Sequence, residues 1–250
     1  MAAEAPGQAQ APSMRELLAR YGHSNCDLGT DKAVVHCYGE LYDRLLGGEL
    51  RRRARAVVEA GVASGASLVA LAEFFPGAQV TGIDVDVSRV RFAHPRVAVR
   101  EADCTTPAAL ELFGPGAAFD LVLDDASHRP NDQVALLRLF GPRLAPGGMV
   151  VVESVDGRFY EEARARLDAQ AAALGLAAQW HDMRHATGRF DDVVAVFTDL
   201  RLATPAPVSA PPAPAPAPVA PAAPAPTPTA TTPAPTPVAA AAPRPPSGLL

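Results

Sequence analysis

The sequence predicts an α/β fold in which helices cover both faces of a seven-stranded, mainly parallel sheet. Two observations lead to this prediction. Short segments rich in Val, Ile and Leu alternate with helical segments from residue 56 to residue 200, and this order is typical of parallel strands joined by helical crossovers. The last two predicted strands are separated only by a polar loop, residues 185–192. This loop is too short for a helical crossover, so we expect the last pair of strands to be antiparallel.

Two helices are predicted before the alternation begins. Ser13 begins the first one, and Glu16 follows three positions later, which is the pattern of a capping box. Apolar and aromatic side chains recur at helical spacing over residues 34–46, and Gly47-Gly48 ends this second helix. We therefore expect residues 14–50 to form a helical cap.

The remaining elements follow in order and make up one domain over residues 51–203. The predicted strands are residues 56–60, 79–83, 97–100, 121–124, 149–153, 177–184 and 193–200. The predicted helices between them are residues 67–75, 88–92, 106–113, 131–144 and 159–174, and Gly175 ends the last one.

The two ends of the chain differ from this domain in composition. From Thr204 onward the sequence is almost entirely Pro, Ala, Thr and Val, and most of the 26 prolines of the chain lie there. Such a segment has no apolar face that it could bury, so residues 204–250 are predicted to be a disordered, extended tail. Residues 1–13 are predicted to be a disordered N-terminus for the same reason.

Composition also argues against several classes of partner. The net charge is −5, and the one basic run, residues 51–55, is expected to be a solvated helix face rather than a nucleic-acid contact. No apolar stretch is long enough to span a membrane, and no secretory signal begins the chain. Three cysteines without a pattern indicate reduced thiols and a cytoplasmic protein.

A glycine turn after the first strand predicts a ligand site. Gly61 and Gly65 allow the backbone to come close to a ligand, because neither residue has a Cβ atom. The amides that begin the following helix would face that ligand. Asp84 ends the next strand, at the position where a nucleotide-type ligand places its ribose hydroxyls.

Polar residues follow all of the first five strands, at the edge where open α/β sheets bind ligands. Because each of these residues alone also has a structural explanation, their common position carries the prediction. The candidate site residues are Glu59, Gly61, Ser64, Gly65, Asp84, Asp103, Asp124, Asp125, His128, Glu153 and Ser154.

The segment Glu59-Ala60-Gly61-Val62-Ala63-Ser64-Gly65 resembles the glycine motif of class I S-adenosylmethionine-dependent methyltransferases. The resemblance implies a Rossmann-like methyltransferase sheet that binds S-adenosylmethionine. It places Asp84 at the position of the ribose-binding acid and Asp103 at that of the acid near the adenine amine. A third glycine of the G-x-G-x-x-G pattern is missing, which argues against an NAD-dependent oxidoreductase.

A narrower resemblance covers residues 27–201. The leader Gly29-Thr30-Asp31-Lys32, with His36, Tyr38 and Tyr42 after it, is similar to that of bacterial macrolide-sugar and rhamnosyl O-methyltransferases and their cephalosporin-hydroxylase-like relatives. So are the blocks Asp125-Ala126-Ser127-His128, Pro146-Gly147-Gly148 and Val151-Val152-Glu153.

This narrower resemblance implies roles for the residues after the fourth and fifth strands. Asp125 and Glu153 would bind a divalent metal, and His128 would act as general base. Ser154 stands where the sugar methyltransferases tend to carry a second acid, so a neutral oxygen would be the third ligand and dependence on Mg²⁺ stays open.

The predicted function is therefore methyl transfer from S-adenosylmethionine to a hydroxyl of a small molecule, a glycoside or another polyhydroxylated natural product. The alternative is a catalytically decayed cofactor-binding protein that recruits a partner through its Pro/Ala-rich tail. The loop over residues 155–160 is short, which indicates either an open site or one that a neighbouring subunit completes in a homo-oligomer. His36, Tyr38 and Tyr42 either close over the ligands or belong to the core.

Overall fold

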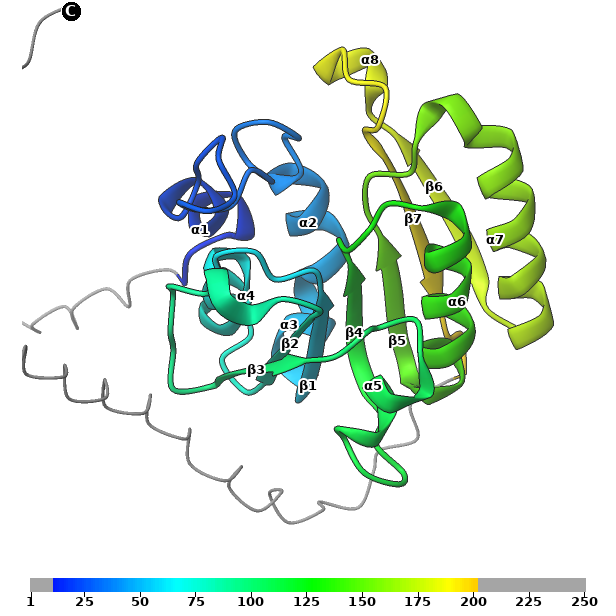
Figure 1. Cartoon of the computed structure of the whole chain (residues 1–250), viewed down its shortest axis with the longest axis horizontal. Coiled ribbons are helices and arrows are strands. Elements are labelled where there is room, and N and C mark those ends of the chain that lie inside the picture. Colours follow the sequence, from blue (N-terminus) through cyan, green and yellow to red (C-terminus); the bar gives the residue numbers. More distant parts are fainter. Residues whose placement is uncertain (1–10, 202–250) are drawn as a thin grey trace, which may run out of the picture. The chain divides into compact units, whose positions relative to one another are not determined.

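The computed structural model describes residues 11–201 (Figure 1). The predicted disordered tail, residues 204–250, and most of the predicted disordered N-terminus lie outside the described residues. Within them, seven strands form a single sheet in the order β3-β2-β1-β4-β5-β7-β6. The strands are β1 (Ala56–Ala60), β2 (Gln79–Asp84), β3 (Val97–Glu101), β4 (Phe119–Asp124), β5 (Leu144–Val152), β6 (Ala177–Asp182) and β7 (Val193–Thr198).

The pairing of these strands confirms the predicted sheet. The first five strands pair in parallel, whereas β7 runs antiparallel to both β5 and β6. In the middle of the sheet, Val57 of β1 lies between Val80 of β2 and Leu121 of β4. The parallel strands therefore end at one common edge, where the residues that follow them meet.

Helices cover both faces of the sheet (Figure 1). The helices are α1 (Met14–Arg20), α2 (Gly39–Leu46), α3 (Gly48–Arg53), α4 (Ala66–Phe74), α5 (Pro107–Glu111), α6 (Pro130–Phe140), α7 (Tyr160–Leu174) and α8 (Arg184–Thr187). Short 3₁₀ turns lie at Val87–Arg89, Gly141–Arg143 and Gly157–Phe159. Side chains alternate between the two faces along each strand, so Val57 packs in the same cluster as α1 to α4, and Val58 packs with α6 and α7.

The helical cap forms largely as predicted. Ser13 and Glu16 make the reciprocal hydrogen bonds of a capping box at the start of α1. The second helix was predicted from residue 34, but α2 begins only at Gly39. The physical reason is the backbone of Cys37, whose φ of +56° cannot be part of a right-handed helix.

The basic run is not simply a solvated face. Arg53 donates to Asp120 and to the carbonyl of Gly147, and Arg51 donates to the carbonyl of Phe74 and lies over its ring. Arg53 thus attaches α3 to the first residues of β4 and β5, and Arg51 attaches it to the end of α4, far from the edge where the site residues meet. The described residues contain no helix both long and apolar enough to cross a membrane.

Candidate active site

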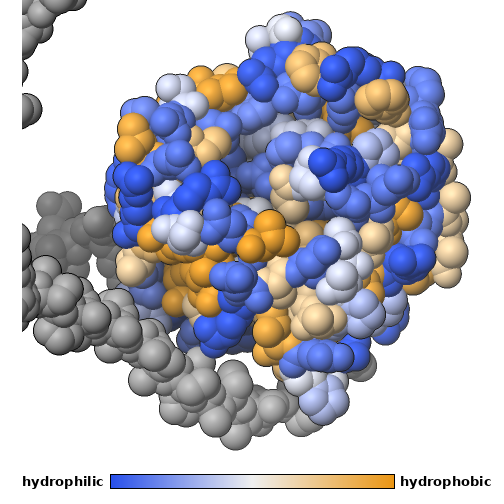
Figure 2. Space-filling model, viewed as in Figure 1, coloured by the Kyte–Doolittle hydropathy of each residue, from blue (hydrophilic) through white to orange (hydrophobic). Residues whose placement is uncertain are grey.

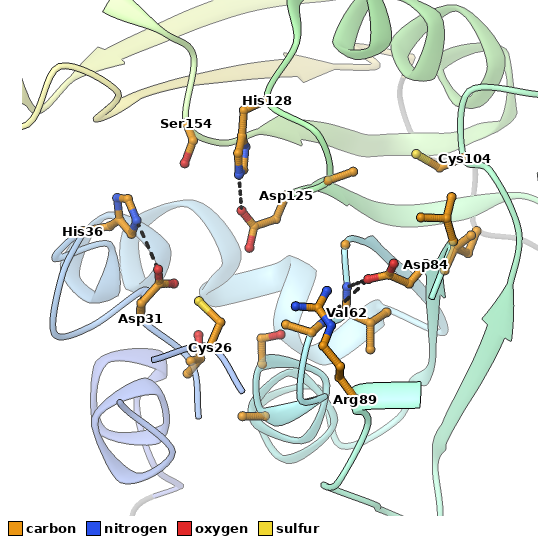
Figure 3. A pocket seen from close by; sticks show the side chains of 18 of the residues that line it. Cys26, Asp31, His36, Val62, Asp84, Arg89, Cys104, Asp125, His128 and Ser154 are labelled. Atoms are coloured by element: carbon orange, nitrogen blue, oxygen red, sulfur yellow. Dashed lines mark hydrogen bonds and ion pairs between the residues drawn. The ribbon is translucent and has the colours of Figure 1, made fainter. Parts of the chain in front are cut away.

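A cleft opens at the carboxyl ends of the parallel strands, and its volume is about 380 Å³. The turn after β1, the ends of β2, β4 and β5, and the loop between α1 and α2 form its walls (Figure 3). In the space-filling view, hydrophilic side chains surround the hollow between the helical cap and the edge that carries α8 (Figure 2). The predicted site residues that line the cleft are Gly61, Asp84, Asp125, His128 and Ser154.

One end of the cleft consists of the turn after β1 and the tip of β2. Gly61 and Gly65 have φ angles of +85° and +84°, and Gly65 is the N-cap of α4. The backbone N–H of Val62 donates to the Asp84 carboxylate at 2.7 Å, which fixes the turn to the end of β2. This end therefore offers small residues, the first turn of α4 and one carboxylate, the combination expected for a nucleoside-type ligand.

Five of the candidate residues predicted on the cofactor side do not line the cleft: Glu59, which is described below, Gly65 in the turn itself, and Ser64, Asp103 and Asp124. The Ser64 hydroxyl is buried and donates to the carbonyl of Gly29 at 2.9 Å. Asp103 is exposed and accepts from the Thr105 hydroxyl at 2.6 Å. Asp124 is buried, and its Oδ2 has no hydrogen-bond partner among residues 11–201. Burial raises the pKa of Asp124 to about 7.

The other end of the cleft is formed by the residues after β4 and β5. The His128 ring and the Asp125 carboxylate point toward each other, with Nε2 3.9 Å from Oδ1 (Figure 3). His128 and Ser154 have φ angles of +57° and +52°. Such angles are uncommon for residues other than glycine and cluster at functional sites. Both residues thus hold unusual conformations where they face the cleft.

A buried lysine lies beneath this end of the cleft. Lys32 Nζ is 2.6 Å from Asp125 Oδ2, 2.6 Å from Glu153 Oε2 and 3.4 Å from Glu59 Oε1. The hydroxyl of Tyr42 also donates to Glu153. Burial alone would lower the pKa of Lys32, but the three carboxylates outweigh it and raise the pKa well above its usual value. Lys32 is therefore charged.

The glutamates of this cluster are among the predicted site residues, but neither lines the cleft. Glu59 is fully buried, accepts from the Ser67 hydroxyl at 2.7 Å and was predicted to contact the cofactor. Glu153 was predicted to bind a metal. Burial raises the pKa of both carboxyl groups, and the Lys32 ammonium opposes that shift. Their role in the structure is to surround Lys32.

The sequence prediction assigned no role to Lys32. A signal was nevertheless present, because Lys32 is the only lysine of the chain and every other basic residue among the 22 Lys and Arg is an arginine. This single departure from arginine is the feature of the sequence that could have drawn attention to Lys32.

The predicted metal ligands do not fit a divalent ion in this arrangement. Mg²⁺ takes near-octahedral oxygen ligands, several of which are commonly water. Asp125 Oδ2 and Glu153 Oε2 both contact the Lys32 ammonium, and Glu153 lies behind it, out of the cleft. An ion that bridged the two carboxylates would have to displace Lys32.

A second charged cluster lies on the cap side of the cleft. His36 Nδ1 is 2.5 Å from Asp192 Oδ1, and His36 Nε2 is 3.4 Å from Asp31. Burial lowers the pKa of His36, but these two carboxylates outweigh it and raise the pKa to about 9. Ligand atoms of His36, Asp191 and Asp192 lie close enough to hold a metal ion, yet Arg189 already pairs with Asp191 at 2.9 Å.

The three aromatic residues of the leader thus divide between the two expected roles. His36 lines the cleft and connects the loop between α1 and α2 to the start of β7. Tyr38 and Tyr42 are fully buried and belong to the core.

Residues 58–155 match the family model described as a methyltransferase domain. The sheet order, the antiparallel last pair and the glycine turn agree with that match. Over residues 58–155 the chain is thus similar to a methyltransferase domain.

Two curated relatives share sequence with this chain. The 8-demethyl-8-alpha-L-rhamnosyl tetracenomycin-C 2'-O-methyltransferase of Streptomyces olivaceus is 34% identical over 143 residues, which cover 53% of this chain and 36% of the relative. The trans-aconitate 2-methyltransferase of Paracidovorax citrulli (strain AAC00-1) is 35% identical over 128 residues, covering 50% of this chain and 46% of the relative. The alignments thus span less than half of either relative.

Solved structures show the same fold. The MycE methyltransferase from the mycinamycin biosynthetic pathway, in complex with Mg and SAH, has a TM-score of 0.58 and 22% sequence identity, covering 77% of this chain and 56% of MycE. A second MycE structure, with Mg, SAH and mycinamycin VI, has a TM-score of 0.58 and 23% identity, covering 77% of this chain and 54% of MycE.

Proposed function

We propose that this chain transfers a methyl group from S-adenosylmethionine to a hydroxyl group of a small molecule, a glycoside or another polyhydroxylated natural product. The observation that carries the proposal is the division of one cleft into two ends. The glycine turn and Asp84 form the end suited to a nucleoside, and Asp125 and His128 form an end suited to moving a proton.

The methyl donor supplies an activated carbon on a positively charged sulfur. As the acceptor oxygen attacks, a C–O bond forms, the C–S bond breaks and its electron pair stays on the sulfur of S-adenosylhomocysteine. The hydroxyl proton passes to the imidazole of His128 and from there to solvent, because His128 is partly exposed. Asp125, 3.9 Å from His128 Nε2, stabilises the imidazolium that forms.

The placement of His128 favours a hydroxyl over a carboxylate as the acceptor. A carboxylate is already ionised at neutral pH, whereas a hydroxyl is a weak nucleophile until a base removes its proton. Of the two relatives, one is named for methylation on a rhamnosyl compound and the other for trans-aconitate. A base in the cleft fits the first kind of acceptor.

The alternative, a decayed cofactor-binding protein that recruits partners through its tail, gains no support. Its tail lies outside the described residues. The other observation in favour of this alternative was Ser154, which stands in place of a second acid. Ser154 lines the same cleft as Asp125 and His128.

A matched pair of variants tests the proposal. His128→Ala is expected to lower turnover about 100-fold or more, while the Kd for S-adenosylmethionine changes only a few-fold. His185→Ala, an exposed histidine on α8 that does not line the cleft, should leave both quantities unchanged. Turnover is measured with radiolabelled methyl donor and a panel of glycosides, and Kd by calorimetry. Equal loss of turnover and binding in His128→Ala would show a structural role instead.

A further inference from the structure

The cluster around Lys32 resembles a site for a bound cation, except that the cation is the ammonium group of the lysine side chain. Three carboxylates, from β1, the loop after β4 and the residue that follows β5, converge on one ammonium group. Asp125 and Glu153 are the two residues whose carboxylates the sequence resemblance assigned to a divalent metal. We propose that Lys32 takes the place of a metal ion at this site and holds the Asp125 carboxylate beside His128.

The geometry suits an ammonium group in particular. Lys32 Nζ has three N–H donors, and three carboxylates lie within 3.4 Å of it. An ammonium is a compact point charge, whereas a guanidinium is a flat fork that matches one planar partner at a time. The chain uses arginine at every other basic position and lysine only here, where three carboxylates surround the side chain.

The same contacts connect Lys32 to the reacting end of the cleft. One oxygen of Asp125, Oδ2, contacts Lys32, and the other, Oδ1, faces His128. The side chain of Lys32 itself is buried beneath the cleft and does not line it. Lys32 is therefore a positioning residue that acts through Asp125, and its catalytic effect rests on the proposed function.

Removing the ammonium should create a metal site. Lys32→Ala leaves three carboxylates around an empty space, a ligand set that hard divalent cations prefer. The wild-type chain, by contrast, should bind no divalent cation between Asp125 and Glu153.

Manganese binding, followed by loss of the electron paramagnetic resonance signal of free Mn²⁺, tests this directly. Wild type is expected to show no site that depends on Glu153, and Lys32→Ala to gain one Mn²⁺ with at least about 10-fold higher affinity than wild type. The double variant Lys32→Ala with Glu153→Gln should lose it again. Arg53→Ala, which removes the cation from the Arg53–Asp120 pair elsewhere in the fold, should gain no site.

Activity gives a second readout. Wild type should keep its methyl transfer in the presence of a chelator, and Lys32→Ala should lose about 100-fold and recover part of it with Mn²⁺. A wild-type Mn²⁺ site that Glu153→Gln abolishes would overturn the inference, as would a folded Lys32→Ala variant that gains no site.

Two further results keep the inference separate from folding and from the proposed function. Circular dichroism checks that each variant is folded. If Lys32→Ala does not fold, Lys32→Met takes its place. The Mn²⁺ titration of wild type needs no variant at position 32 and tests the inference in either case. If no acceptor is methylated by wild type, the proposed function fails while the Mn²⁺ result stands by itself.

Discussion

Gly61 and Asp125 approach each other so closely that a Cβ on Gly61 would lie 2.0 Å from the carbonyl oxygen of Asp125. The glycine thus serves the packing of the turn after β1 against the loop after β4, as well as any ligand that binds there. Asp125 and His128 belong to that loop. This backbone contact therefore joins the end of the cleft formed by the glycine turn and Asp84 to the end formed by Asp125 and His128.

Gly61→Ala should therefore displace the loop that carries Asp125. We expect a loss of about 2 kcal/mol or more in the free energy of unfolding, from the positive φ angle and the steric overlap together. The matched control is Gly116→Ala, because Gly116 has a similar φ of +83° but open space where its Cβ would lie. Denaturant unfolding compares the two. Equal losses would mean that the contact with Asp125 contributes nothing.

Asp84→Ala should weaken binding of S-adenosylmethionine by about 10-fold or more, because the variant lacks the carboxylate that faces the nucleoside end and fixes the turn. Asp103→Ala should change the Kd about two-fold at most, since the Asp103 carboxylate is exposed and bonded to Thr105. Calorimetric titration measures both. A larger effect at Asp103 would mean that its side chain turns toward the bound ligand.

His36 should make stability fall at alkaline pH. Its pKa is raised to about 9 in the folded chain from an unfolded value near 6.5. The stabilisation is therefore complete below about pH 6.5, is lost as the pH rises through about 9, and amounts to at most about 3 kcal/mol. Unfolding of wild type and His36→Gln at pH 6 and pH 9.5 checks this. A difference between the two proteins that stays constant with pH would contradict it.

Asp124 should also make stability fall as the pH rises, but over a lower range and because the buried carboxylate becomes costly to ionise. Its pKa is raised to about 7 from 3.8, so the folded chain retains a proton that the unfolded chain releases. Ionising the buried carboxylate therefore lowers the free energy of unfolding as the pH rises from about 4 to about 7, by at most about 4 kcal/mol. Asp124→Asn should gain stability relative to wild type between pH 4.5 and pH 8. A relative stability that falls over this interval would show that the buried carboxylate is ionised and stabilising.

The fold could be predicted from the sequence where the signals are local. β1 begins and ends at the predicted residues, because Val57 and Val58 each bury on one face of a central strand. The second helix could not be placed as well. His36 and Tyr38 bury at a spacing that resembles a helix, but they do so from a turn that the backbone of Cys37 interrupts.

The site could be predicted in position but not in orientation. Parallel strands end at one edge, so the polar residues after them had to lie near one another. Which side chain faces the cleft depends on local turns, and so Asp125 lines it while Asp124 is buried. Lys32 reaches Asp125 across 93 positions of sequence from a loop outside the α/β alternation, and no local pattern reports such a contact.

Methyl transfer to a panel of rhamnosides and macrolide glycosides tests the central claim most directly. The wild-type chain is incubated with radiolabelled S-adenosylmethionine, and the labelled products are treated with mild alkali, which cleaves methyl esters and leaves methyl ethers intact. We predict alkali-stable label on at least one glycoside, and its loss in His128→Ala. Label found only in alkali-sensitive products, or no label on any glycoside although the methyl donor binds, would contradict the assignment of a hydroxyl acceptor.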